Sequence, residues 1–77
     1  MGDFPTLRGR VLLAVLLREP LNVRVVRTRG SHRVLTAPGR PRIIFAFHDT
    51  REVAGSAVKE ILVNQVGLTV DEARRLV

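Results

Sequence analysis

The sequence predicts an α+β fold consisting of a helix, a three-stranded antiparallel meander, a second helix and a short C-terminal helix. Three observations predict it. An apolar run near the N-terminus stops at a proline, the middle of the chain holds three β-rich segments separated by turn residues, and apolar residues recur at helical spacing in the last third. With 77 residues, 45% of them apolar, the chain is expected to form one domain over residues 1–77.

The first helix is expected to run to about Glu19, because Pro20 cannot continue it. Thr6 or Asp3 is expected to cap its start. Gly9 lies inside this helix and is expected to weaken it by about 1 kcal/mol.

Three strands follow, and each is rich in β-branched or aromatic residues. They are expected at residues 23–28, 31–37 and 42–48. Asn22 tolerates a left-handed conformation and is well placed to turn the chain into the first strand. Short turns at Arg29-Gly30 and at residues 38–41 make both strand pairs antiparallel hairpins.

The last third of the chain predicts two helices. An apolar stripe at helical spacing over residues 54–66 predicts the first, which Gly67 ends. Thr69 and Glu72 have the spacing of a capping box, so a short final helix should begin at Val70. Both main helices should pack on one face of the meander and leave the other face free.

The positive charge is concentrated in the first half of the chain. Thirteen Lys and Arg against seven Asp and Glu give a net charge of +6. Nine arginines and one acid, Glu19, lie between Arg8 and Arg42, whereas the segment from Asp49 onward has four basic and five acidic residues. A polyanion would therefore meet the first half. Twelve of the thirteen basic residues are arginine, which phosphate recognition and a GC-rich genome would each explain.

Two features bear on the compartment. The chain has no cysteine, which excludes disulfides and thiolate metal sites. The apolar run of residues 11–17 is far too short to span a bilayer, and no small-residue cleavage site follows it. We therefore expect a cytoplasmic protein without a membrane partner.

The most informative motif is Gly30-Ser31-His32, which follows an arginine-studded strand. An imidazole both takes and gives a proton near neutral pH, and arginines beside it would hold a phosphate within reach. This combination points to chemistry on a nucleic acid. Without further evidence, however, a lone histidine in a strand is more often a packed or hydrogen-bonded structural residue than a catalytic one.

The candidate RNA-binding residues belong to the same hairpin: Arg27, Arg29, Gly30, Ser31 and Arg33. Arg29 and Arg33 flank the histidine closely enough to bind the scissile phosphate, and Ser31 can donate a hydrogen bond to a non-bridging oxygen of it. Gly30 is needed for a turn conformation that other residues resist. Solvated surface charge is the alternative role of the arginines.

His48 is a secondary candidate and is favoured as a structural residue. If Ala37 pairs with Arg42, His32 faces Phe47 on the more apolar face of the sheet, and His48 falls on the opposite face. The two histidines would then not form a catalytic pair. Two histidines without cysteines or an acidic cluster make a poor metal site, so we expect no metal and no cofactor.

The chain resembles the HicA-type (YcfA-like) toxins, which cleave RNA in bacterial toxin–antitoxin pairs. The resemblance covers roughly residues 24–76. It rests on the basic stretch into Gly-Ser-His, the second turn, the histidine ending the third strand, and the second helix with its exit. The residues are Arg27-Thr28-Arg29-Gly30-Ser31-His32, Pro38-Gly39-Arg40, His48, Gly55-Ser56, Ile61-Leu62 and Gly67-Leu68-Thr69.

The resemblance implies a fold like the double-stranded RNA-binding domain and metal-independent cleavage of mRNA centred on His32. It also implies neutralisation by a HicB-like antitoxin, which we expect to be acidic and to cover His32. Two alternatives belong to other classes: a non-catalytic RNA-binding module of the same topology, and a domain whose basic face serves only an acidic protein partner.

Overall fold

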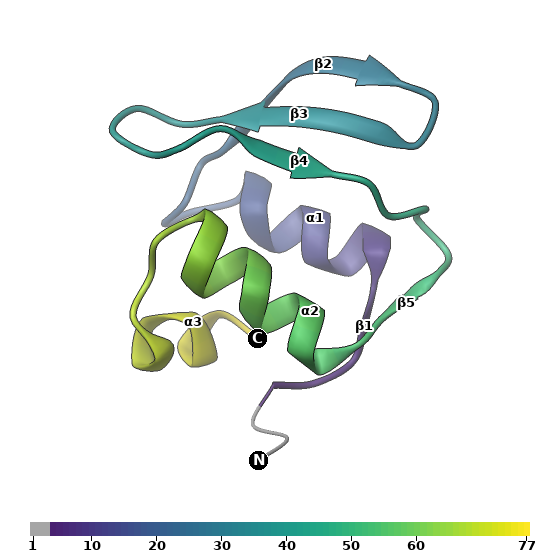
Figure 1. Cartoon of the computed structure of the whole chain (residues 1–77). Coiled ribbons are helices and arrows are strands. Elements are labelled where there is room, and N and C mark those ends of the chain that lie inside the picture. Colours follow the sequence, from purple (N-terminus) through teal and green to yellow (C-terminus); the bar gives the residue numbers. More distant parts are fainter. Residues whose placement is uncertain (1–3) are drawn as a thin grey trace.

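The computed structural model describes residues 4–77, and its order of elements confirms the predicted α+β class (Figure 1). The elements are β1 (Leu7–Arg8), α1 (Gly9–Leu17), β2 (Arg24–Arg29), β3 (His32–Thr36), β4 (Ile43–Phe45), β5 (Glu52–Val53), α2 (Gly55–Lys59), the π-helical η1 (Glu60–Gln65) and α3 (Val70–Leu76). Strands β2, β3 and β4 form one antiparallel sheet in that order, and β1 pairs with β5 in a separate two-stranded sheet.

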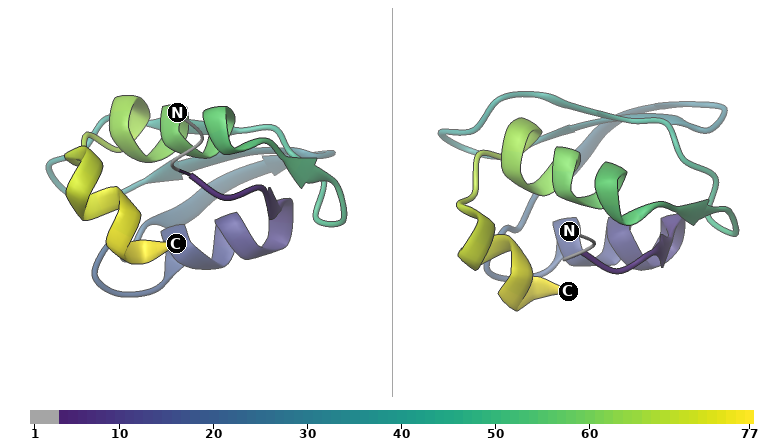
Figure 2. Two further views of the ribbon diagram at one scale, coloured as in Figure 1. Left: turned by 90° about the horizontal axis from the view of Figure 1, so that it is seen from below. Right: turned by 60° about the horizontal axis from the view of Figure 1, so that its bottom comes forward.

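The molecule has two layers. Helix α1 and the continuous helix formed by α2 and η1 lie side by side against one face of the β2–β3–β4 sheet, and α3 packs near the end of η1 (Figures 1 and 2). The opposite face of the sheet is left uncovered by these helices, as predicted. The order of one helix, three antiparallel strands and a second helix is that of the double-stranded RNA-binding domain.

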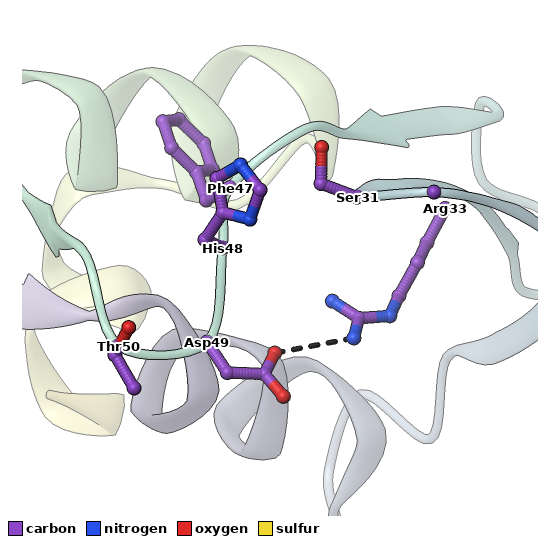
Figure 3. Close-up of a pocket in the computed structure, with 7 residues that line it drawn as sticks. Ser31, Arg33, Phe47, His48, Asp49 and Thr50 are labelled. Atoms are coloured by element: carbon purple, nitrogen blue, oxygen red, sulfur yellow. Dashed lines mark hydrogen bonds and ion pairs between the residues drawn. The ribbon is translucent and has the colours of Figure 1, made fainter.

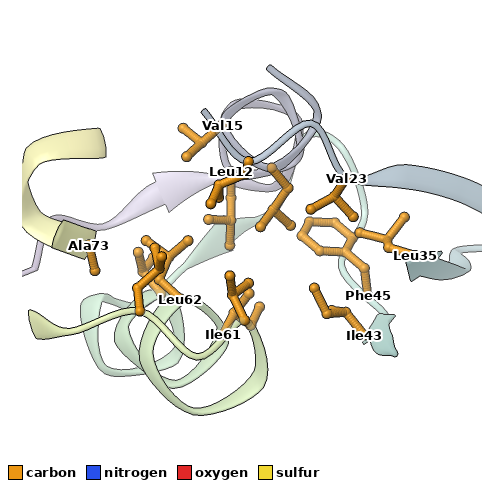
Figure 4. Close-up of a cluster of buried hydrophobic side chains, with 14 of the residues drawn as sticks. Leu12, Val15, Val23, Leu35, Ile43, Phe45, Ile61, Leu62 and Ala73 are labelled. Carbon is orange, nitrogen blue, oxygen red and sulfur yellow. The ribbon is translucent and has the colours of Figure 1, made fainter. Parts of the chain in front are cut away.

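One hydrophobic core fills the space between the layers (Figure 4). Phe45 from β4 is its largest fully buried side chain, and its ring meets that of Phe47 edge to face at 5.4 Å between centroids. Leu12 from α1, Leu35 from β3 and Leu62 from η1 are also completely buried. Because apolar burial is the main favourable term in folding, this cluster fixes how the hairpin sits on the helices.

Local sequence signals in the connections are confirmed. Asn22 has a positive φ of 49°, and Gly67, with φ 95°, ends the second helix. In α3 the Thr69 side chain accepts a hydrogen bond from the Glu72 N–H at 3.1 Å, and the Glu72 carboxylate accepts one from the Thr69 N–H at 2.9 Å. The second helix lies within the predicted range. Its second half is π-helical, which was not predicted, and the Val66 N–H donates to the Ile61 carbonyl five residues earlier.

The predicted start of the first helix is wrong. The helix begins at Gly9, and Arg8 occupies the N-cap position, but its side chain makes no capping hydrogen bond to the helix. Thr6 is therefore not the cap, and Asp3 lies outside the described residues. The two residues before the helix pair with β5 instead, in a strand that the sequence did not predict.

A distant loop replaces the missing cap. The Gly9 N–H donates to the Arg51 carbonyl at 2.8 Å, and the Arg10 N–H donates to the Asp49 carbonyl at 3.0 Å. Helix starts leave such N–H groups without intrahelical partners, so the loop satisfies both. The approach is close: a Cβ on Gly9 would overlap the His48 carbonyl oxygen. Gly9 is therefore a packing requirement and not only a weak helix former.

The strand register also differs from the prediction. Leu35 pairs with Ile43, so the register between β3 and β4 is shifted by one residue from the one that would pair Ala37 with Arg42. The third strand ends at Phe45, three residues earlier than predicted. A slip of one residue turns every side chain of a strand to the other face. The observed register is the one that buries Leu35, Ile43 and Phe45 together.

None of the helices within residues 4–77 combines the length and the apolarity needed to cross a membrane.

Candidate functional site

The Gly-Ser-His motif forms the corner of the hairpin between β2 and β3. Gly30 has φ 61°, and nothing lies within 4 Å of the position that a Cβ would take there, so the residue is needed for its backbone conformation. Arg29 and His32 are directly paired across the hairpin, which places both side chains on one face of the sheet. His32 is exposed.

The expectation that His32 lies on the apolar face is wrong, because it rested on the wrong register. In the observed register, Val34 and Ile44 pair on the face of His32, and Ile44 is 52% exposed. The imidazole therefore lies on the uncovered face of the sheet, where a large substrate can reach it.

A β-bulge decides which face the arginines of β2 occupy. Val25 pairs with Leu35, but the next pair is Arg27 with Val34, so Val26 is an extra residue without a partner. Without the extra residue, strand alternation would turn Arg27 toward the helices. The bulge moves the following arginines to the uncovered face.

We name the exposed polar group on this uncovered face the outer-face cluster; it consists of Arg24, Arg27, Arg29 and His32. Within residues 4–77, none of its three arginines has an ion pair or a side-chain hydrogen bond. Guanidinium groups match phosphate oxygens bidentately, so the cluster combines free phosphate-binding groups with a proton-transfer group.

Arg33 does not join this cluster. It pairs with Thr28 and Phe45 on the helix-facing side of the sheet, because adjacent residues of a strand alternate. The expectation that Arg33 flanks His32 at one phosphate is therefore wrong. Its guanidinium Nη2 donates to the Asp49 carboxylate at 3.1 Å, and its side chain is only 20% exposed. The other terminal nitrogen, Nη1, is buried and has no hydrogen-bond partner among the described residues.

A second polar feature lies around the corner from the cluster. It is an open pocket of about 440 Å³, which we name the corner pocket (Figure 3). Its lining consists of Gly30, Ser31, Arg33, Phe47, His48, Asp49 and Thr50. Figure 3 shows His48 and Arg33 on opposite sides of the opening with Asp49 below.

The candidate residues are thus divided between two places. Arg27, Arg29 and His32 belong to the outer-face cluster, whereas Ser31, Arg33 and His48 line the corner pocket, with Gly30 at the junction. His48 is exposed and lies beyond the end of β4, so the strand alternation used to place it does not apply. His32 is not among the residues that line the pocket.

The wall that carries His48 is held by the start of α1. The Arg51 N–H donates to the His48 carbonyl at 3.2 Å, and the Arg8 guanidinium donates to the Thr50 carbonyl at 2.8 Å. Together with the two carbonyls that cap α1, these contacts fix residues 48–51 against the helix. The loop therefore presents His48 and Asp49 from a fixed backbone.

Sequence reasoning missed Asp49 and Thr50 as lining residues. The signal that could have found them is Gly9, a poor helix former at a helix start, because it indicates close approach of another backbone. Nothing local identifies which segment approaches.

In the part of the chain that the structure describes, no three His, Asp or Glu side chains gather as a metal site would require.

A family model described as the HicA toxin of bacterial toxin-antitoxin matches residues 12–68. The match includes every residue of the outer-face cluster and of the corner pocket. No curated protein and no solved structure matches the chain.

Proposed function

The chain belongs to the HicA toxin family of bacterial toxin–antitoxin systems, and from this premise we propose that it is an endoribonuclease that cleaves mRNA through His32. Residues 1–77 act as one domain in the cytoplasm, where the substrate is. The chemistry needs no cofactor and no metal.

The observation that supports this proposal is the placement of His32. Its imidazole is exposed, stands opposite Arg29 and shares the uncovered face with the other unpaired arginines of β2. An RNA strand can lie along this face without displacing any part of the protein. A structural histidine would instead be packed or hydrogen-bonded, and among the described residues His32 has no side-chain hydrogen bond.

The reaction is general acid–base catalysis. Cleavage of RNA needs a base for the 2′-hydroxyl proton, an acid for the departing 5′-oxygen, and cations near the phosphate as charge builds on it. His32 performs one proton transfer, and Arg27 and Arg29 bind the scissile phosphate. A single positioned acid or base contributes about 10²–10⁴-fold in rate, so the enzyme is slow.

RNA binding is dominated by phosphate contacts and has low sequence specificity. Phe4 and Phe45 are buried and Phe47 is half-buried, so the aromatic rings of residues 4–77 do not form an exposed platform for stacking bases. Affinity should therefore fall steeply with salt. Arg27, Arg29, Gly30, Ser31 and Arg33 form the RNA-binding set, on both sides of the hairpin corner.

A toxin of this family implies an antitoxin partner, and we propose an acidic HicB-like protein that covers His32. The uncovered face offers what such a partner needs, because exposed arginines lie beside the apolar side chains of Val26 and Ile44, which are 54% and 52% exposed. Acidic groups would meet the arginines while the apolar side chains are buried.

The test replaces His32 with alanine and, as a second variant, with glutamine. Because the side chain is exposed, both variants should fold, which thermal unfolding checks. We expect the cleavage rate to fall by about 10²–10⁴-fold, growth arrest to disappear and RNA affinity to persist. Lys59→Ala, which removes an exposed charge in α2, is the control and should cleave normally.

Unchanged cleavage by His32→Ala would contradict the proposed catalytic role. A wild-type protein that binds RNA without cleaving it would be the non-catalytic binding module. Absence of RNA affinity at low salt would leave a domain for protein association only.

A further inference from the structure

We propose that the corner pocket is a second phosphate subsite, in which Arg33 and His48 hold an RNA phosphodiester next to the one at His32. The inference rests on the proposed function and extends it, because it assigns a ligand to a place that the acid–base chemistry does not use. The RNA strand would pass around the hairpin corner from the outer-face cluster into the pocket.

The first support is the shared position of the two sites. Gly30 and Ser31 line the corner pocket, and His32, the next residue, carries its side chain on the outer face. A strand whose scissile phosphate lies at His32 therefore passes the opening of the pocket when it bends around Gly30.

The second support is the state of the Arg33 guanidinium. Asp49 accepts from Nη2 only, and Nη1 is buried without a partner in residues 4–77. A buried donor without an acceptor is unfavourable, so this ion pair satisfies the guanidinium incompletely. A phosphate can accept from both terminal nitrogens at once, after the side chain turns toward the opening. Phosphate binding would thus exchange one acceptor for two.

The third support is the composition of the pocket walls. His48 faces the opening opposite Arg33 and can donate a hydrogen bond to an anionic oxygen (Figure 3). The edge of Phe47 gives the lining an apolar wall. The wall residues are held by the contacts of residues 48–51 with α1, so little ordering is needed when a ligand binds.

Asp49 provides a test of the proposal, because the proposal predicts whether RNA affinity rises or falls when its charge is removed. Its carboxylate competes with a phosphate for Arg33, and it repels an anion in the pocket. Removing the carboxylate charge should therefore tighten RNA binding. Removing Arg33 or His48 should weaken RNA binding.

The experiment measures the dissociation constants of fluorescent RNA oligonucleotides of two to twelve nucleotides, in the His32→Ala protein, which binds without cutting. Asp49→Asn should tighten binding of the longer oligonucleotides by about threefold to tenfold, and His48→Gln should weaken it by a similar factor. Arg33→Gln should weaken binding and reduce the slope of log K against log salt by about 0.7, the contribution of one phosphate contact on a single strand.

Lys59→Gln is the matched control, because it removes one exposed positive charge away from the pocket. It should leave the dependence on oligonucleotide length unchanged. Thermal unfolding of each variant reports folding, and Arg33→Lys, which keeps the charge and loses the fork, replaces Arg33→Gln if that variant unfolds.

The proposal is overturned if Asp49→Asn weakens RNA binding, or if the pocket variants bind oligonucleotides of every length as the control does. It is also overturned if these variants change only the affinity for the antitoxin, because the pocket would then serve the protein partner. Failure of the proposed function would give a different result, because the wild-type protein would then not cleave RNA, whatever the effect of the pocket variants on binding.

Discussion

The substitution Gly9→Ala should destabilise the protein, whereas helix propensity alone predicts that it stabilises it. By propensity alone, alanine in place of glycine inside a helix stabilises it by about 1 kcal/mol. In the structure, a Cβ at residue 9 would overlap the His48 carbonyl oxygen and lie 3.0 Å from its carbonyl carbon. The overlap with the oxygen is the tighter of the two contacts, and atoms in contact prefer about 3.5–4.0 Å, so the helix and the loop must separate by about 1 Å.

The separation stretches the two hydrogen bonds that cap α1, at 2.8 and 3.0 Å, beyond useful length. Each is worth about 1 kcal/mol net, so about 2 kcal/mol is lost together. After the propensity gain of about 1 kcal/mol is subtracted, Gly9→Ala should destabilise the protein by about 1 kcal/mol. For a chain of this size the melting temperature should fall by about 4–8 °C.

The assay is thermal and urea unfolding followed by circular dichroism, with every variant made in the His32→Ala background. Ala14→Gly on the exposed side of α1 is the control, and it should show the ordinary propensity cost of about 1 kcal/mol. A Gly9→Ala protein as stable as its parent, or more stable, would refute the reasoning that the loop at His48 closes on this helix.

Three further predictions concern single contacts. Gly30→Ala should lower the free energy of unfolding measured in urea by about 1–2 kcal/mol, because φ is positive at this residue even though there is room for a Cβ. Gly30→Asn should lower it by less, and equal losses for the two variants would contradict the reasoning. Phe45→Ala should cost about 3–5 kcal/mol and leave the chain largely unfolded by circular dichroism, since the ring is fully buried; a folded variant of parental stability would contradict this. Hydrogen bonds from the Thr69 backbone and side chain hold the pKa of Glu72 below its usual range. The ionised carboxylate therefore stabilises the folded protein at pH values above the ordinary glutamate pKa, and this contribution is lost as pH falls through the lowered pKa. In an NMR titration, Thr69→Ala should move the pKa of Glu72 part of the way upward, because the backbone N–H of residue 69 is kept, and an unmoved pKa would contradict the contribution of the Thr69 side chain.

Much of the fold follows from local patterns in the sequence. The helix over residues 54–66, the three strands and the final helix are each specified by periodicity, turn residues or caps that act within a few positions. Asn22, Gly67 and the pair of Thr69 and Glu72 perform locally what their chemistry predicts. The Gly-Ser-His motif likewise places its imidazole at a hairpin corner from sequence alone.

The division of the site between two faces was decided by tertiary structure. Pairing Leu35 with Ile43 buries the apolar side chains of both strands, and this long-range packing sets the register that puts His32 outside. The bulge at Val26 then brings Arg27 to the same face. A local pattern cannot specify either feature, because strand alternation has the same period in both registers and only the opposite layer distinguishes them.

The loop after β4 shows the same limit. Its polar residues are typical of an ordinary connection, and the sequence predicts that a side chain caps the first helix. Only folding brings residues 48–51 to the start of α1, where their carbonyls cap the helix and Asp49 meets Arg33. The sequence by itself determined the secondary structure and the chemical groups, which depend on neighbours along the chain. The tertiary structure decided which of those groups meet, because that depends on packing between segments some forty residues apart.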